Sequence, residues 1–432
     1  ALTRGAASGP VHINFPFDKP LEPPLDGDEV GNDRIREFRR DYPRAGAGRK
    51  EGEPFVRVTS GVYLPEAHEV GRIRAACQGA RKGLIVAGPV PDPVEVGPAV
   101  LKLGALTGFP VLADPLSGAR YAEPLGSVVV GGYVLFLRSP WARAALSPDL
   151  IIRVGGSPTS AALLAFLEEA RDARQIVVDE GPRWKDHLAT AQESVQASIQ
   201  AFVGDLPWDM KTMSASGWVD LWTGAEERTR NTLNGREAGE FLEGDILAAV
   251  GARIPHGANL FVASSMPIRD LDAFCFPRTG GGTFQVFGNR GVSGIDGLVS
   301  TTVGIAVGSE ERPSVPVTVG VLGDLAFFHD MNGLLALKSM KPRVVLVVIN
   351  NDGGGIFETL PVREHEPAFS EFFSTPHGLE FERAADLYGI SYSRAATLAD
   401  FKETFARLIL GEGPSIIEVP TKRRETHQQR GE

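Results

Sequence analysis

Short apolar runs of strand length alternate along much of the chain with longer segments in which apolar residues recur every three to four positions. The runs fall into two groups, separated by residues 188–257, whose pattern is mostly helical and carries the chain towards a second domain. Parallel strands buried on both faces have this near-continuous apolar character. Strands are expected at 83–87, 111–113, 150–154 and 175–178, and then at 260–263, 286–287, 317–322, 344–349, 390–392 and 415–419.

Helical periodicity fills most of the gaps between these runs. Repeated alternation of strand and helix predicts parallel sheets with helices packed on both faces. The fold class expected is therefore α/β, with two doubly wound, mostly parallel-sheet domains. The helices are expected at 94–106, 160–173, 297–307, 329–340, 381–387 and 398–410.

The ends of the chain and one internal stretch depart from this alternation. Residues 1–60 are rich in proline, glycine and charge, which predicts a short strand at 9–16 and an extended linker over 20–48. The polar tail from residue 422 is expected to fray. Residues 354–378 are expected to form a long irregular loop, and loops of that length in compact domains usually carry function.

Composition narrows the class of protein. A chain of 432 residues with 43% apolar and 23% charged residues is typical of a soluble globular protein of two or three domains. The net charge of -10 argues against a general nucleic-acid binder. With two cysteines, no signal-like start and no apolar run of membrane-spanning length, a cytoplasmic protein without a membrane span is expected. The chain does not begin with methionine, so we expect it to be a piece of something longer.

Two expected strands each end in a turn that offers oxygen ligands. Gly323-Asp324-Leu325 follows one apolar run, and Asn350-Asn351-Asp352-Gly353 follows the next. Open α/β sheets bind ligands at this carboxyl edge. Asp324, Asn351 and the Gly353 carbonyl, together with phosphate oxygens of a ligand, would suit Mg²⁺. Each turn alone would usually be only a turn, but the pair on consecutive strands favours a metal and diphosphate site.

Gly353, which ends this turn, is the first of three consecutive glycines. They include Gly354, which permits close approach of the backbone to a ligand. Ile356 and Phe357 come next and are suited to packing against an aromatic cofactor ring. A flexible loop in which these two side chains cover the core is the alternative.

Two further segments place arginines after expected strands. Arg290 lies in the glycine-rich stretch 288–297. It could either bind a substrate carboxylate through two hydrogen bonds or form a structural ion pair. Ser265 is placed like a helix N-cap, followed by Pro267. Arg269 lies one turn along on the same face; capping explains Ser265 but not Arg269.

Arg183 and Lys185 belong to a charged segment at the end of the first group of strands. They could either be part of a charged segment exposed to solvent or supply a basic group that reaches an acidic substrate.

Four segments of the second half carry a more specific pattern. Gly323-Asp324 with Asn350-Asn351 resembles the cofactor motif of the thiamine diphosphate (ThDP) decarboxylase and acetolactate-synthase superfamily, although Leu325 stands where a glycine is usual. Four longer segments match one family within this superfamily. They are NRGVSGIDG at 289–297, GDLAFFHDMNG at 323–333, NNDGGGIFETLP at 350–361 and TPHGLEF at 375–381.

Together these segments resemble the MenD family, the ThDP-dependent synthases of 2-succinyl-5-enolpyruvyl-6-hydroxy-3-cyclohexene-1-carboxylate in menaquinone biosynthesis. The resemblance is detailed over residues 255–390 and holds at the level of fold over 60–190. It implies a transferase that decarboxylates 2-oxoglutarate and adds the resulting carbanion to isochorismate in a 1,4 sense.

The resemblance also implies roles for individual residues. Asp324, Asn351 and the Gly353 carbonyl would bind Mg²⁺, with Mn²⁺ as an alternative, beside a ThDP site that includes Gly323, Leu325 and Gly354. Ile295 would support the bent form of ThDP. The wall around the cofactor would be formed by Ile356, Phe357 and Leu360, and the substrate contacts by Ser265, Arg269 and Arg290.

Members of the family have a pyrimidine-binding, a central and a diphosphate-binding domain in that order. Residues 1–60 would be the end of the first domain plus a linker, 61–195 the central domain and 196–432 the diphosphate-binding domain. The rest of the first domain, of roughly 150–200 residues, is expected to be missing, and with it the activating glutamate. Because the family's site is shared between subunits of a homodimer or tetramer, this chain would supply half a site.

Two other hypotheses about the function remain open. One is another ThDP-dependent carboligase or decarboxylase of the acetolactate synthase type, which would hold a flavin. The other is a fragment that binds the cofactor without catalysis.

Overall fold

The structure is a computed structural model. It describes residues 11–17, 29–49, 55–59, 61–181, 184–204, 217–235, 241–278, 280, 282–309, 316–423 and 426. The chain divides into two units. The larger consists of Leu64–Asp179 and Trp184–Glu432, and the smaller of Ala1–Tyr63 and Glu180–Arg183.

The described part of the smaller unit contains two helices, α1 (Glu29–Asp41) and α2 (Pro43–Ala47). The extended linker predicted over 20–48 is therefore wrong over these ranges, where pairs such as Arg40 with Glu37 support a solvated helix. The strand predicted at 9–16 is also wrong where it is described. Residues 11–17 are exposed and pair with no strand of the described part of the chain, while residues 9 and 10 lie outside that part.

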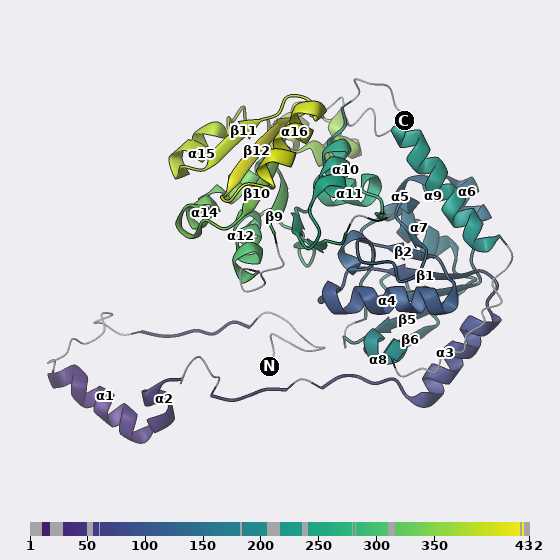
Figure 1. The fold of residues 1–432 in the computed structure, drawn as a ribbon, viewed down its shortest axis with the longest axis horizontal. Coiled ribbons are helices and arrows are strands. Elements are labelled where there is room, and N and C mark those ends of the chain that lie inside the picture. Colours follow the sequence, from purple (N-terminus) through teal and green to yellow (C-terminus); the bar gives the residue numbers. More distant parts are fainter. Residues whose placement is uncertain are drawn as a thin grey trace. The chain divides into compact units, whose positions relative to one another are not determined.

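The first sheet of the larger unit has six parallel strands in the order β3-β2-β1-β4-β5-β6. This is the order of a doubly wound sheet, in which the chain starts near the middle and winds outwards in both directions. Strands β1, β2, β5 and β6 of this sheet are labelled in Figure 1. The strands are β1 (Gly83–Ala87), β2 (Val111–Ala113), β3 (Val129–Val130), β4 (Leu150–Val154), β5 (Arg174–Asp179) and β6 (Glu193–Gln196).

Helices cover both faces of this sheet because alternate strand residues point to opposite sides. On β1, Ile85 packs with α3, α4 and α8, whereas Leu84 packs with α5, α7 and α9. Trp218 of α9 also donates a hydrogen bond of 2.9 Å to the carbonyl of Gly83. The helices are α3 (Ala67–Gly79), α4 (Pro93–Thr107), the short η1 (Pro115–Ser117), α5 (Tyr133–Phe136), α6 (Pro140–Ala145), α7 (Ala161–Glu169), α8 (Ile199–Gly204) and α9 (Trp218–Asn234).

A buried ion pair lies beside this sheet. Arg153 of β4 donates to Asp186 at 2.6 Å, and the Asp186 carboxylate also accepts from the Ala191 N–H at 2.8 Å. Burial would raise the pKa of Asp186, but the hydrogen bonds from Ala191 and Arg153 outweigh it and lower the pKa. A carboxyl with a lowered pKa stabilises the fold above its ordinary pKa and loses that contribution as the pH falls.

We therefore expect the melting temperature to fall as the pH drops below about 4, and this acid-side slope to shrink in Asp186→Asn. Thermal unfolding between pH 7 and pH 3 measures it, with the exposed Asp172→Asn as the matched control. An unchanged slope in Asp186→Asn would contradict the assignment.

The second sheet also has six parallel strands, in the order β11-β12-β10-β9-β7-β8. Strands β9 to β12 of this sheet are labelled in Figure 1. Since all the strands are parallel, their carboxyl ends meet at one edge. The strands are β7 (Asn259–Val262), β8 (Gln285–Phe287), β9 (Thr318–Gly323), β10 (Val344–Asn350), β11 (Ser391–Arg394) and β12 (Ser415–Pro420).

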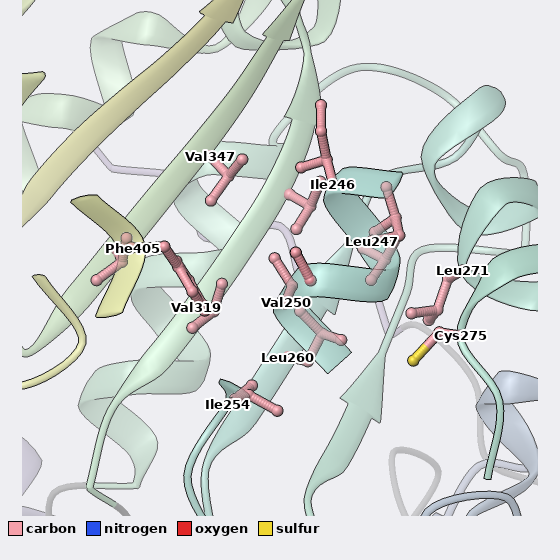
Figure 2. Close-up of a cluster of buried hydrophobic side chains, with 14 of the residues drawn as sticks. Ile246, Leu247, Val250, Ile254, Leu260, Leu271, Cys275, Val319, Val347 and Phe405 are labelled. Atoms are coloured by element: carbon pink, nitrogen blue, oxygen red, sulfur yellow. The ribbon is translucent and has the colours of Figure 1, made fainter. Parts of the chain in front are cut away.

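Two apolar clusters sandwich this sheet. On one face, Ile246 and Val250 of α10 point towards the strands that carry Val319 and Val347, as Figure 2 shows. On the other face, α12, α14 and α15 pack together. The helices are α10 (Glu243–Arg253), α11 (Met266–Phe274), α12 (Leu298–Gly308), α13 (Asp324–His329), α14 (Leu334–Met340), α15 (Glu382–Tyr388) and α16 (Leu398–Leu408). Across the described residues, no helix is both long enough and apolar enough to cross a bilayer.

The α/β fold class is confirmed, with local differences. The helix predicted at 329–340 is confirmed over 334–340 but wrong before that: α13 ends at His329, a short turn η2 (Met331–Gly333) follows, and α14 begins at Leu334. Asp330 bends the chain there because its carboxylate accepts from the N–H and hydroxyl of Ser300. The region 188–257, predicted to be mostly helical, also contains β6. Only one of the four residues of β6, Val195, is buried, so the sequence of this strand has a polar pattern.

The loop over 354–378 is less irregular than predicted. It contains three short helical turns, η3 (Gly355–Thr359), η4 (Pro361–Glu364) and η5 (Ser370–Ser374). The three-part division of the chain at residues 60 and 195 stays a prediction.

Candidate functional site

The ends of β9 and β10 lie side by side, with Gly323 opposite Ile349. Asp324 follows directly as the first residue of α13, and only 2% of it is exposed. Its carboxylate accepts backbone N–H groups from Leu325 at 2.6 Å, Asn351 at 3.1 Å and Gly353 at 2.9 Å. Burial raises the pKa of Asp324, and the hydrogen bonds from Gly353 and Leu325 oppose the rise. Asp324 therefore ties the turn after β10 to the end of β9.

Asn351 presents an oxygen that the described part of the protein does not satisfy. Its Nδ2 donates to Glu243 Oε1 at 2.9 Å, whereas its Oδ1 is buried and has no hydrogen-bond partner among the described residues. A buried polar atom without a partner costs free energy, so it often marks the place of an ion or ligand. Asn351 Oδ1 thus has the chemistry of a cation ligand beside the Asp324 carboxylate.

The glycines at these two strand ends differ in what surrounds them. Gly353 has a φ of 130°, and a Cβ there would lie 2.0 Å from the carbonyl oxygen of Ser374. Gly354 is restricted in the same way, since a Cβ would lie 2.3 Å from the carbonyl of Phe373. At Gly323, by contrast, a Cβ would meet no described atom within 4 Å, which leaves room for a ligand against that backbone.

This set of groups fits Mg²⁺ in a site completed by phosphate oxygens. One carboxylate, one amide oxygen and one backbone carbonyl are hard oxygen donors and leave coordination positions for a ligand. Across the described ranges there is no cluster of three or more His, Cys, Asp or Glu residues able to hold a metal without a ligand.

His377 joins the site although no role was predicted for it. Its Nε2 lies 3.3 Å from Asp324 Oδ2, and its Nδ1 accepts the Leu379 N–H at 3.0 Å. Since Nδ1 accepts that N–H, Nε2 is the ring nitrogen that faces the Asp324 carboxylate. The segment TPHGLEF contains this histidine, but its contact with Asp324 spans 53 residues and has no periodic signal in the sequence.

Apolar side chains flank the metal edge. Ile356 and Phe357 lie in η3, where Phe357 makes an edge-on ring contact with Phe373 at 5.5 Å between centroids. Leu360 follows and is 46% exposed, and Ile295, before α12, is 38% exposed. These exposed apolar side chains are available to cover an apolar part of a ligand.

Ser265 and Arg269 come after β7 and belong to α11. Ser265 occupies the N-cap position, but its side chain makes no capping bond and its φ is 73°, so capping does not explain this serine. Arg269 instead donates to the Ser265 carbonyl at 2.6 Å. Burial, and after it the positive charge of Arg290, lowers the pKa of Arg269. Arg290 thus lies near enough to Arg269 to act on it electrostatically.

No carboxylate within the described residues forms an ion pair with Arg290, which disfavours the structural ion pair considered for it. Since β7, β8, β9 and β10 are parallel, Arg269 and Arg290 follow strand ends at the same edge as Asp324. Two guanidinium groups close together at one edge attract anions. Lys185, in contrast, pairs with Asp179 at 2.6 Å after β5, and Arg183 lies outside the described residues.

Two family models of thiamine pyrophosphate enzymes match most of the chain. The family described as "Middle domain of thiamine pyrophosphate" matches residues 54–262, and "Thiamine pyrophosphate enzyme, C-terminal TPP binding domain" matches residues 281–419. In fold, the chain is similar to benzoylformate decarboxylase from Polynucleobacter necessarius, with a TM-score of 0.60 and 16% identity over 94% of this chain and 77% of that one.

Among curated proteins, the chain is similar to enzymes named 2-succinyl-5-enolpyruvyl-6-hydroxy-3-cyclohexene-1-carboxylate synthase. The identity is 40% for that of Halobacterium salinarum, covering 99% of this chain and 71% of the relative. It is 38% for Haloarcula marismortui, covering 100% and 71%, and 35% for Bacillus cytotoxicus, covering 98% and 68%. The chain therefore belongs to the 2-succinyl-5-enolpyruvyl-6-hydroxy-3-cyclohexene-1-carboxylate synthase (MenD) family of thiamine diphosphate-dependent transferases.

Proposed function

We propose that the protein catalyses the decarboxylation of 2-oxoglutarate and the 1,4-addition of the succinyl carbanion to isochorismate, with ThDP and Mg²⁺ or Mn²⁺. The product is 2-succinyl-5-enolpyruvyl-6-hydroxy-3-cyclohexene-1-carboxylate, an intermediate of menaquinone biosynthesis. One observation carries the proposal: Asp324 and the unpartnered oxygen of Asn351 share a sheet edge with two arginines that form no ion pair within the described residues.

Different residues of the chain would bind the cofactor and the substrates. Asp324, Asn351 Oδ1 and the Gly353 carbonyl would hold the cation that binds the diphosphate. When bound, ThDP supplies an electron sink for loss of CO₂ from a 2-oxo acid. Ile295, together with the apolar residues Ile356, Phe357 and Leu360, would hold the cofactor and exclude water.

The arginines are suited to substrates that are multiply charged acids. The guanidinium groups of Arg269 and Arg290 can each bind a carboxylate through two parallel hydrogen bonds. Ser265, which leads into α11, would place its hydroxyl near the same ligands. The pair would therefore select dicarboxylates such as 2-oxoglutarate over the monocarboxylate pyruvate.

We also propose that a pyrimidine-binding domain of a second subunit completes the site in a homodimer or tetramer. The chain covers 71% of the Halobacterium relative, which leaves room for such a domain in the full-length family members. None of the residues placed at the sheet edge takes the role of the activating glutamate that the family resemblance implies.

Consumption of isochorismate with 2-oxoglutarate, ThDP and Mg²⁺ tests this function. The protein is assayed alone and with the pyrimidine-binding domain of a relative, with the product identified by mass spectrometry. Product in either arm supports the proposal. Product from pyruvate instead of 2-oxoglutarate, or flavin absorbance in the purified protein, would favour an acetolactate synthase-type enzyme, and no product in both arms would contradict catalysis.

Arg290→Ala is expected to lower kcat/KM for the dicarboxylate substrates by about 10- to 100-fold, the loss of a charge-assisted hydrogen bond of about 1.5–3 kcal/mol. The affinity for ThDP is expected to change by less than about threefold, because Arg290 is not placed among the cation ligands. Steady-state kinetics and calorimetry measure the two effects. Arg253→Ala, an exposed arginine of α10, is the control. An equal loss of ThDP affinity in Arg290→Ala would make Arg290 a structural residue.

A further inference from the structure

The side chain of Asn351 has two ends of nearly equal shape and opposite chemistry. One is the Oδ1 acceptor and the other is the Nδ2 donor, and their assignment depends on the groups that surround them. A cation can be held only if Oδ1 faces it. The group that fixes the orientation of this amide therefore decides whether the metal site exists.

Glu243 is that group. It is the first residue of α10 and only 3% of it is exposed. Its Oε1 accepts from Asn351 Nδ2 at 2.9 Å and from the Thr421 hydroxyl at 2.9 Å. Because Oε1 acts as an acceptor in both contacts, Glu243 holds Nδ2 of the amide towards itself and turns Oδ1 the other way. That oxygen is then buried without any partner in the described part of the chain.

Gly355 packs closely against the Asn351 amide. A Cβ at Gly355 would lie 2.6 Å from Asn351 Nδ2, so the glycine is closely packed over the amide. The contact joins α10, the turn after β10 and the residue that follows β12, which are distant in sequence.

The neighbouring asparagine provides a contrast within the same strand end. Asn350 Nδ2 donates to another buried carboxylate, Glu418, at 2.8 Å. The Oδ1 of Asn350, however, accepts the Asp352 N–H at 3.1 Å and is satisfied. Two consecutive asparagines are thus each held by a glutamate, but only the one held by Glu243 leaves an oxygen for a ligand.

We propose that Glu243 is a positioning residue for the cation: it orients the Asn351 amide so that Oδ1 faces the metal beside Asp324. This inference rests on the proposed function, since it assumes that a divalent cation binds ThDP at this edge. It assigns no contact with substrate or cofactor to Glu243.

The test is Glu243→Gln, with ThDP binding followed by calorimetry over a range of Mg²⁺ concentrations. The introduced glutamine can donate its own N–H to Asn351 Oδ1, which removes that oxygen from the cation. Loss of an outer partner of a metal ligand costs about 10- to 100-fold in metal affinity, and we expect the Mg²⁺ concentration for half-maximal ThDP binding to rise by that factor. Glu418→Gln is the matched control, with an expected rise of less than about threefold.

A compensating variant separates orientation from a general structural role. In Glu243→Gln combined with Asn351→Asp, the new carboxylate has acceptor oxygens on both sides. One can accept from the introduced glutamine while the other faces the cation, so Mg²⁺ dependence is expected to return to that of the unchanged protein. The double variant also keeps the total charge, which makes it the informative protein if Glu243→Gln alone does not fold.

The outcomes distinguish this inference from the function on which it rests. If the unchanged protein binds ThDP without dependence on Mg²⁺, or does not bind it, the proposed function fails. If it shows the dependence but folded Glu243→Gln shows the same, or the double variant stays as weak as the single one, the role of Glu243 is overturned.

Discussion

Replacing Asp324 with alanine is expected to abolish Mg²⁺-dependent binding of ThDP. Asp324 offers the only carboxylate among the three proposed ligands, and its oxygens also hold the backbone of Asn351 and Gly353 in place. The substitution therefore removes one ligand and releases the other two. Since loss of an outer partner alone costs about 10- to 100-fold, we expect a loss beyond about 100-fold in apparent Mg²⁺ affinity.

Titration calorimetry of ThDP at several Mg²⁺ concentrations measures this effect. Asp330→Ala is the control, because this nearby carboxylate binds Ser300 rather than the strand ends. Binding of ThDP by folded Asp324→Ala at the Mg²⁺ concentrations that serve the unchanged protein would contradict the metal assignment.

Replacing Arg120 with methionine is expected to cause the largest loss of stability. Arg120 is buried and donates to the side chain of Asp272 on α11, to its carbonyl at 2.6 Å and to the Gly131 carbonyl at 2.8 Å. Tyr133 donates to the same carboxylate at 2.8 Å. Removing one partner of a buried ion pair leaves an uncompensated charge, which costs about 3–5 kcal/mol of unfolding free energy.

Equilibrium unfolding in urea measures this loss, and the double variant Arg120→Met with Asp272→Asn is the control. It removes both charges of the pair, while the introduced amide oxygen can still accept from Tyr133, so it is expected to be more stable than Arg120→Met alone. Additive losses in the double variant would contradict a coupled pair. Because α11 also carries Arg269, we expect the single variant to raise KM for the dicarboxylate before it unfolds.

The sequence predicted best those elements whose signal is local. β1 and β4 have the predicted bounds because every residue in them is buried and, apart from Arg153, none is polar. β3 was missed because it has only two residues. β6 was missed because only one of its four residues is buried. The break between α13 and α14 depends on Asp330 binding Ser300, a contact across 30 residues that periodicity cannot report.

The candidate site divides in the same way. Asp324, Asn351 and Gly353 stand in short turns after apolar runs, so their position at one sheet edge follows from strand order. His377 and Glu243 could not be found from the sequence, because their contacts with this edge join residues 53 and 108 positions apart. The backbone of Ser265 likewise has a conformation that no sequence pattern indicated.

A crystal of the protein grown with ThDP and Mn²⁺ would test the central claim most directly. The anomalous signal of manganese locates the cation without reference to any proposed role. The account predicts one peak coordinated by Asp324, Asn351 Oδ1 and the Gly353 carbonyl, with diphosphate oxygens on its other side. A bound cofactor whose metal lies away from these three groups, or a cofactor bound elsewhere in the chain, would contradict it.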